Sequence, residues 1–456
     1  MYRKAARLIV GKSEDFPEND VSATKLGTLE QPRHIYGSLG CCFSPERPLI
    51  SRSASTMPSS KTSAIPFFAI PMLSLAAFGS AISLRVTDPL LPALAHEFGI
   101  SLGQVAYIIT AFSLAYGIAQ LFFGPVGDRF GKYWVIACAC VACAVTALLC
   151  GLAPNYPILV LTRLMAGATA AAIIPLSMAW IGDVVPYEER QPVLAQFLIG
   201  QILGVSAGVL LGGLAADYLG WRVPFFAISL GFVLISITLF SINRRLPIHA
   251  KIAHQHPANS ALHRIFSELG QVLAKPWARV VLLSVFFEGT FLFGAFAFIA
   301  THLHRVHHLS LTTAATIVML FGGGGFLYAC ISRRLVKGFG EHGLTRWGSV
   351  LITISFILIA LAPSWWWSVP ACFTSGLGFY MLHNTLQINA TQMAPERRGA
   401  AVSTFASFYY LGQSVGVGIA GLLVARLGTA TLIVCGAMGV LAVGQVFSLC
   451  LSSRNP

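Results

Sequence analysis

The stretch Gly124–Lys132 reads GPVGDRFGK, a short polar turn between two long apolar runs at 104–123 and 133–153. About twelve such runs follow one another between residues 66 and 452. A helix needs ~20 apolar residues to cross a hydrocarbon core of ~30 Å. Lipid offers no hydrogen bonds to an open backbone, which favours helices over irregular chain. The sequence therefore predicts an all-α polytopic membrane protein with twelve transmembrane helices.

Composition and the placement of charge agree with this prediction. Hydrophobic residues make up 55% of the chain and charged residues 10%, with a mean hydropathy of +0.73. Of the 30 Lys and Arg residues, 25 lie in the terminal segments or in the loops after even-numbered spans. Positive charge marks the cytosolic side, so we expect both termini in the cytosol. The net charge of +13 thus reflects topology and gives no reason to expect nucleic-acid binding.

The chain divides into four parts. Residues 1–65 are polar, without apolar periodicity, and we expect a disordered cytosolic tail. Six spans at 66–242 and six at 280–452 form two predicted bundles, joined by a cytosolic linker at 243–279. Gly-Gln-x-x-Gly occurs at 200–204 and again at 412–416. Internal duplication of this kind is how many secondary transporters are built, so the two bundles should be pseudo-symmetric.

The turn at 124–132 matches a family pattern. The loop between helices 2 and 3 of the major facilitator superfamily reads Gly-x-x-x-Asp-Arg-x-Gly-Arg/Lys, and this sequence supplies Gly124, Asp128, Arg129, Gly131 and Lys132. The chain resembles this family over nearly all of 66–452. Gly131 permits a turn with positive φ. The resemblance implies a gate in which Asp128 faces the positive N-terminus of a helix that starts near Ala401. A generic basic turn is the alternative.

Span 5 carries a second pattern, with glycines at Gly204, Gly208, Gly212 and Gly213. It resembles Gly-x-x-x-Gly-Pro-x-x-Gly-Gly, which is associated with proton-coupled exporters of the family, although Val209 stands where that proline is expected. The resemblance implies a smooth packing face between the two halves and favours export over import. Ordinary helix packing through small residues is the alternative.

Ionisable side chains inside the predicted spans are candidate site residues, because such groups are costly in a membrane and are usually paired. Arg163 begins a stretch of span 4 that resembles another family motif, and Asp88 at the end of span 1 is its expected partner. By family analogy, both helices line the substrate cavity. The alternative is that Arg163 extends to the membrane surface.

Glu288 is the predicted coupling residue. It lies about 12 Å into span 7, at ~1.5 Å per residue, among Phe286, Phe287 and Phe291. A carboxyl group in apolar surroundings is costly to ionise, which suits a group that takes up and releases a proton. We expect Glu288, together with Asp88, to couple transport to protons. A structural glutamate bonded to a neighbouring helix is the alternative.

Further polar residues lie in spans 10 and 11, and we expect them to line the cavity or to bond neighbouring helices: His383, Asn384, Gln387 and Gln413. The histidines at 302, 304, 307 and 308 cluster after span 7, where an exposed loop is a better interpretation than a metal site. The sequence lacks the phosphate-binding pattern GxxxxGK[ST]. We therefore expect no metal, no cofactor, no ATP-driven step and no enzymatic activity.

These features predict a secondary transporter of the bacterial inner membrane that exports a small organic molecule by alternating access. The proton gradient is the expected energy source, and the lipid bilayer, protons and substrate are the expected partners of a monomer. Two alternatives remain open. One is an importer or facilitator of a metabolite on the same fold, and the other is a membrane sensor that binds a ligand without transporting it.

Overall fold

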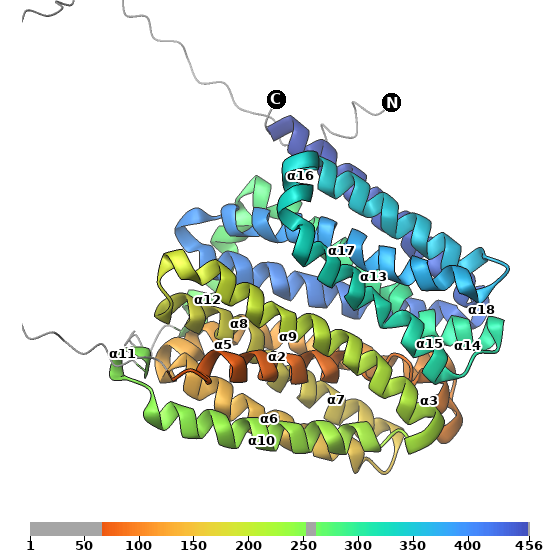
Figure 1. Ribbon diagram of the computed structural model, residues 1–456, viewed down its shortest axis with the longest axis horizontal. Helices are drawn as coiled ribbons and strands as arrows, with labels where there is room; N and C mark the ends of the chain where they lie inside the picture. The colour runs from red at the N-terminus through yellow and green to blue at the C-terminus, as the bar shows by residue number, and fades with distance from the viewer. Residues whose placement is uncertain (1–65, 252–260, 455–456) are drawn as a thin grey trace, which may run out of the picture. The chain divides into compact units, whose positions relative to one another are not determined.

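Long helices joined by short turns make up residues 66–251 and 261–454, the part of the chain that the computed structural model describes (Figure 1). No strand occurs within these ranges. They belong to one compact unit. The tail predicted to be disordered, residues 1–65, lies outside the described residues, as does the linker segment 252–260.

The first half of the described chain contains helices α2 Ala69–Arg85, α3 Leu91–Phe98, α4 Leu102–Val105, α5 Tyr107–Phe130, α6 Lys132–Gly151, α7 Tyr156–Ala170, α8 Ile173–Val184, α9 Tyr187–Leu214, the π-helix η1 Ala215–Leu219, and α10 Val223–Arg245. Two short helices of the linker follow, α11 Ile248–Lys251 and α12 Ala261–Ala274. The second half contains α13 Pro276–Phe296, α14 Ile299–His307, α15 Leu311–Val318, α16 Leu320–Leu361, η3 Trp365–Trp367, α17 Ser368–Gln392, η4 Pro395–Arg397 and α18 Arg398–Arg454.

The number of spans agrees with the prediction. Among the described residues, eight continuous helices are long and apolar enough to cross a membrane. Two of these eight contain a break, α16 at Gly340 (φ 62°) and α18 at Gly428 (φ 75°), so each of them supplies two spans. Together with α2 and α17, this gives twelve spans within the described ranges. The predicted all-α class with twelve helices is confirmed.

One boundary differs from the prediction. The polar stretch after the second span is not a turn, because α5 continues through it to Phe130 and the chain breaks only at Gly131, where φ is 91°. A helix keeps its own backbone hydrogen bonds beyond the apolar run, so polarity alone does not end it. The prediction of positive φ at Gly131 is confirmed.

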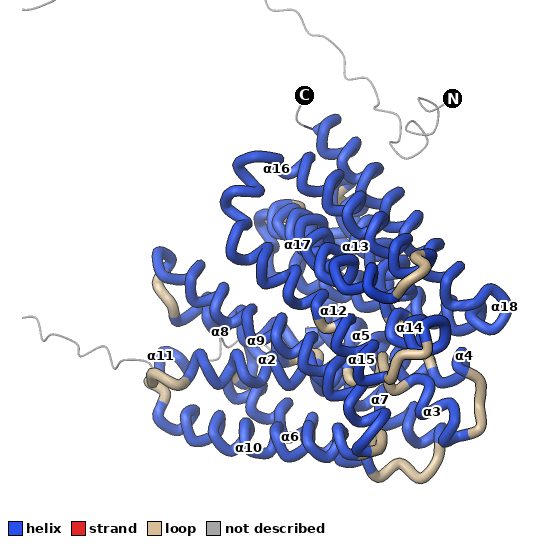
Figure 2. Tube along the Cα trace, turned by 45° about the vertical axis from the view of Figure 1, so that its right-hand side comes forward, coloured by secondary structure: helices blue, strands red, loops and turns tan. Residues whose placement is uncertain are grey.

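Two large apolar cores and one small cluster lie among the described helices. One core is built mainly from α2–α10, shown in red to green, and the other mainly from α13–α18, shown in green to blue (Figures 1 and 2). Tyr409 of α18 packs against both cores. This arrangement supports the proposed division into two bundles, with the linker between them.

The two halves repeat one helix contact. A Cβ placed on Gly204 of α9 would lie 2.4 Å from the carbonyl oxygen of Phe78 in α2, and one on Gly416 of α18 would lie 2.0 Å from that of Thr290 in α13. The fifth span therefore touches the first as the eleventh touches the seventh. Helices in lipid associate through close packing of this kind rather than through the hydrophobic effect.

Candidate functional site

A buried arginine joins the two halves near the middle of the molecule. Arg85, the last residue of α2, is 2% exposed. Its Nη1 lies 3.4 Å from Oδ2 of Asp88, and its Nη2 donates to Oε1 of Gln413 in α18 at 3.3 Å. Nε2 of Gln413 in turn donates to Oγ of Ser113 in α5 at 2.9 Å. The predicted site residues Asp88 and Gln413 thus meet through Arg85, which the sequence analysis did not single out.

Aromatic rings continue this network into the second half. The Arg85 guanidinium lies 3.9 Å from the ring centre of Phe293, a cation–π contact. Phe293 meets Tyr409 edge to face at 5.6 Å, and the Tyr409 ring lies 4.7 Å from that of His383. An unbroken series of contacts therefore runs from the interface between the halves to His383 in α17.

Glu288 and His383 form an acid–base pair in which the carboxyl group is buried and the imidazole is 15% exposed. Oε2 of Glu288 lies 2.9 Å from Nδ1 of His383, and Glu288 is fully buried. Its other oxygen, Oε1, has no hydrogen-bond partner among the described residues. Phe379 stacks on the His383 ring at 5.0 Å. Two residues predicted separately, on spans 7 and 10, are thus brought together in one site.

The structure does not place Arg163 in a direct ion pair with Asp88, although the two charges lie close enough to interact. Asp88 pairs with Arg85, which stands three residues earlier and reaches it within one turn. Arg163 instead donates from Nη1 to the carbonyl oxygen of Ser83 at 2.9 Å and lies 4.2 Å from the ring centre of Phe112. Arg163 is 1% exposed, so it does not extend to the surface. Its Nε and Nη2 have no hydrogen-bond partner in the described part of the chain.

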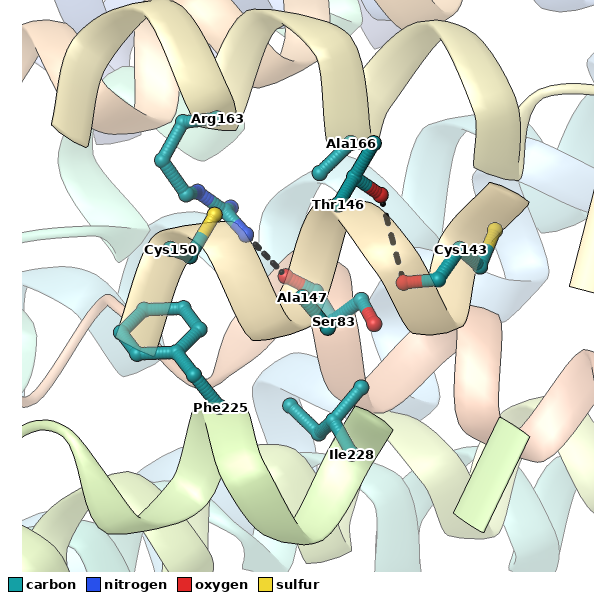
Figure 3. A pocket seen from close by; sticks show the side chains of 9 residues that line it. All are labelled: Ser83, Cys143, Thr146, Ala147, Cys150, Arg163, Ala166, Phe225 and Ile228. Atoms are coloured by element: carbon teal, nitrogen blue, oxygen red, sulfur yellow. Dashed lines mark hydrogen bonds between the residues drawn. The ribbon is translucent and has the colours of Figure 1, made fainter. Parts of the chain in front are cut away.

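A small cavity of about 10 Å³ adjoins Arg163, between α2, α6, α7 and α10 (Figure 3). Its lining combines the guanidinium with small and apolar side chains: Ser83, Cys143, Thr146, Ala147, Cys150, Arg163, Ala166, Phe225 and Ile228. This volume accommodates about one water molecule. It is too small for an organic substrate, so this cavity is not a transport site.

The remaining polar residues of span 10 lie on the same helix as His383. Asn384 is half-buried and lies beside the Tyr328 hydroxyl group of α16. Gln387 is also half-buried, one turn further along α17. Their role in lining a cavity stays a prediction.

The motif at 124–132 forms a charged cluster at one end of the helices, which we call the basic end. Nζ of Lys132 lies 2.5 Å from Oδ2 of Asp183, at the end of α8, and 3.5 Å from Oδ1 of Asp128. The Arg129 guanidinium lies 5.1 Å from the Phe130 ring centre. Asp183 was missed because it lies 51 residues away from Lys132 in the chain. The predicted contact of Asp128 with the helix near Ala401 stays a prediction.

The glycines of span 5 pack differently from the expectation. A Cβ on Gly204 or Gly208 would meet α2 of the same half, and one on Gly212 would meet Val86, directly after α2. Only the last of the series faces the other half, since a Cβ on Gly213 would lie 2.3 Å from Cβ of Ala315 in α15. The motif thus mainly fixes helix contacts within the first half.

The histidine cluster does not form the expected loop, because α14 continues to His307. His302 is 1% exposed, and its two ring nitrogens lie 2.9 Å from Oγ1 of Thr429 and 3.1 Å from the carbonyl oxygen of Ile359. Both nitrogens are therefore engaged in joining three helix ends. Among residues 66–251 and 261–454, no group of three or more His, Cys, Asp or Glu side chains is placed to hold a metal ion.

Several hydrogen bonds join the two halves. Among the described residues, they lie between the middle of the helices and the end that is away from Gly131. We call this end the opposite end. Ser407 donates to the carbonyl oxygen of Gly117 at 2.7 Å, and Ser206 to that of Met319 at 3.0 Å. Nearer the opposite end, a Cβ on Gly103 would lie 2.0 Å from the carbonyl oxygen of Gly421. The halves are thus tightly joined over this part of their length.

Known proteins share this fold and sequence pattern. The family model described as Major Facilitator Superfamily matches residues 73–417. The MFS-type transporter YceJ of Bacillus subtilis (strain 168) is 25% identical over 340 residues, which cover 74% of this chain and 84% of that protein. The quinolone resistance protein NorA of Staphylococcus aureus (strain MRSA252) is 23% identical over 348 residues, covering 75% and 86%.

Among solved structures, a bacterial homologue of the human lysosomal transporter Spinster, in an inward-facing and unoccupied conformation, has a TM-score of 0.64. It is 18% identical, and the match covers 85% of this chain and 96% of that chain. This likeness shows the fold. With the family match over most of the chain, it follows that this protein belongs to the Major Facilitator Superfamily and is a multi-pass membrane transporter rather than an enzyme.

Proposed function

We propose that this transporter exports a small organic molecule by alternating access and that protons drive the cycle through Glu288. The observation that carries the proposal is the buried carboxyl group of Glu288, 2.9 Å from the imidazole of His383, between α13 and α17. A buried carboxylate that has lost its water is destabilised by several kcal/mol unless it is paired and fully hydrogen-bonded. Because Oε1 of Glu288 is unbonded within the described chain, the site favours a carboxyl group that changes its protonation during the cycle.

Coupling also needs a path from this carboxyl group to the surface where the halves meet. His383, Tyr409 and Phe293 provide such a path to Arg85, which bonds Gln413 across the interface. Protonation of Glu288 would remove the charge that holds His383 in place. The rings beside His383 would then repack, and the change would reach the contact between the halves.

Export is the direction that we favour over import. The similarity to a quinolone resistance protein supports it, as does the glycine series of α9, which resembles that of exporters. An importer or facilitator of a metabolite is the second candidate. We further propose a monomer in a bacterial inner membrane with both termini in the cytosol, in agreement with the placement of Lys and Arg.

The test measures the accumulation of a mixed panel of dyes, antibiotics and sugars in cells that express the wild type, Glu288→Gln or Glu97→Gln. Glu97 is a matched control, because it is an exposed glutamate that pairs with Arg222 outside the site. We expect at least one compound to be depleted by the wild type and by Glu97→Gln, and restored by a protonophore or by Glu288→Gln.

Other outcomes are equally informative. Raised accumulation with the wild type, abolished by the protonophore, would identify an importer. Full depletion by Glu288→Gln, at equal expression, would remove Glu288 from the coupling mechanism. If purified protein binds a ligand but moves none into proteoliposomes, the chain is a sensor.

A further inference from the structure

One carboxylate of the first half binds the start of a helix in the second half. Oδ1 of Asp217, in η1, accepts a hydrogen bond from the backbone N–H of Leu311 at 3.2 Å, and Oδ2 accepts one from that of Thr312 at 2.6 Å. These are the first two N–H groups of α15. The third, that of Thr313, donates to the Ser310 side chain. The free N–H groups at this helix end are thus shared between a local cap and a residue of the other half.

The local backbone explains how Asp217 reaches α15. The last turn of this span is a π-helix, closed by a bond from Gly220 N–H to the carbonyl oxygen of Ala215 at 2.8 Å. A π-turn holds an extra residue and re-aims the side chains in it, and such turns are frequent at functional sites. Beside it, Thr312 Oγ1 donates to the carbonyl oxygen of Gly213 at 3.2 Å. The backbones of the two halves therefore meet closely at the opposite end.

We propose that Asp217 is the positioning residue that holds the opposite end closed, and that it is the counterpart of Asp128 at the basic end. Both carboxylates belong to the first half; Asp217 binds a helix start of the second half, and Asp128 is expected to bind another, near Ala401. Asp217 engages α15 in this structure, whereas Asp128 is paired with Lys132. The two contacts would alternate, so that one end is held when the other is released.

The chemistry of the contact indicates that Asp217 holds the two halves together and is not merely an exposed polar residue. A carboxylate at a helix N-terminus is stabilised both by its hydrogen bonds and by the aligned peptide dipoles. Bonds to backbone N–H groups do not depend on a particular partner side chain, so they can re-form in each cycle. At the same end of the molecule, the halves also approach closely between Gly103 and Gly421. Loss of the carboxylate charge should therefore loosen this whole end.

The inference rests on the alternating access of the proposed function, but not on proton coupling or on direction. Its test uses labelling rather than transport, so a failure of the Glu288 experiment leaves it intact. Ser414 reports on the closed region, because it is 3% exposed and donates to the carbonyl oxygen of Thr110 across the interface at 3.0 Å. A cysteine at this position, introduced as Ser414→Cys, would react with a membrane-impermeant maleimide only after the end opens.

Labelling is measured in right-side-out and in inverted vesicles, so that the reagent reaches each end separately. The same variants without Ser414→Cys give the background from native cysteines. Losing a helix cap of this kind should shift the equilibrium between the closed and the open end about five- to thirtyfold. We expect Asp217→Asn to raise the labelling rate from the opposite end by a factor in this range. Glu97→Gln, which removes a carboxylate charge within the first half, should leave the rate unchanged.

A second variant removes the donor instead of the acceptor. Thr312→Pro deletes the N–H that Asp217 binds, and proline is tolerated in the first turn of a helix. Thr312→Val serves as its control, because it deletes only the hydroxyl group. The proposal expects faster labelling in Thr312→Pro than in Thr312→Val. Adding Asp128→Ala to Asp217→Asn should bring the labelling rate back toward that of the wild type.

Two results would overturn the proposal. One is an unchanged labelling rate in both Asp217→Asn and Thr312→Pro, when each protein elutes as a single folded species. The other is an equal rise in Glu97→Gln, which would mean that any loss of charge at this end loosens it.

Discussion

Replacing Gly412 by alanine tests whether close helix packing supports the site. Gly412 lies in α18 against α13, and a Cβ added there would lie 2.0 Å from the carbonyl oxygen of Phe286. The obstacle is backbone, so no side-chain rotation relieves it. A carbon–oxygen contact needs ~3.3 Å, so the two helices must separate by about 1.3 Å.

The size of this shift sets the expected effect. Forcing extra volume into a packed contact costs about 1–3 kcal/mol. For a unit of ~150–250 residues, each kcal/mol lowers Tm by ~2–4 °C, so we expect a loss of roughly 2–12 °C. The neighbouring Gln413 holds hydrogen bonds of 2.9 and 3.3 Å. A displacement of 1 Å or more exceeds the range of a good hydrogen bond, so transport should fall as well.

The assay is thermal unfolding of the purified protein in detergent, followed by fluorescence and by size-exclusion chromatography. Gly418→Ala is the matched control, because it lies in the same helix and its Cβ would come no closer than 3.6 Å to Thr110. Alanine favours helix over glycine by ~1 kcal/mol, so this control should be neutral or stabilising. If Gly412→Ala is as stable as Gly418→Ala, the close contact of α18 with α13 is not a determinant of stability.

Three other changes probe the network and the helix ends. Gly131→Ala places a side chain at φ 91° and 3.0 Å from the Lys251 carbonyl oxygen, so it should cost ~1–3 kcal/mol, measured as a lower Tm. Arg85→Gln leaves the buried Asp88 without its cation, at about 3–5 kcal/mol. The yield of folded protein should drop and should recover when Asp88→Asn is added; no recovery would argue against the pair. Bonding to Arg222 holds the pKa of Glu97 below its usual range, so this pair stabilises the fold at neutral pH and is lost as pH falls through the folded-state pKa. Glu97→Gln should lower Tm slightly at neutral pH, and the difference should vanish once the pH lies below the folded-state pKa of Glu97.

The sequence predicted the features that depend on local chemistry. Apolar length located the twelve spans, and the glycine of the motif predicted the positive φ at Gly131. Glu288 and His383 were recognisable because each is a polar residue in an apolar helix. Their pairing was not predictable, since 95 residues separate them and only the packing of α13 against α17 brings them together.

The residues that the sequence analysis did not identify were missed for physical reasons. Arg85 was not singled out, although its spacing of three residues from Asp88 already places both on one turn. Asp217 was passed over for another reason. Its partners are backbone N–H groups 94 and 95 residues away, and no side-chain pattern reveals such a contact. Contacts made through backbone groups are therefore the contacts of this protein that are hardest to predict from its sequence.

Contacts through the backbone also affect how the two halves separate. The interface uses small residues and bonds to backbone oxygens, such as Ser407 to Gly117 and Ser206 to Met319. Each such bond contributes only ~0.5–1.5 kcal/mol net. If the halves alternate as proposed, the two states must differ by no more than a few kcal/mol, and a ligand or a proton can shift the balance only by its own difference in affinity for them. An interface of many weak contacts made largely through the backbone meets this requirement, because a change of one charge at Glu288 or Asp217 is then comparable to the whole difference between the states.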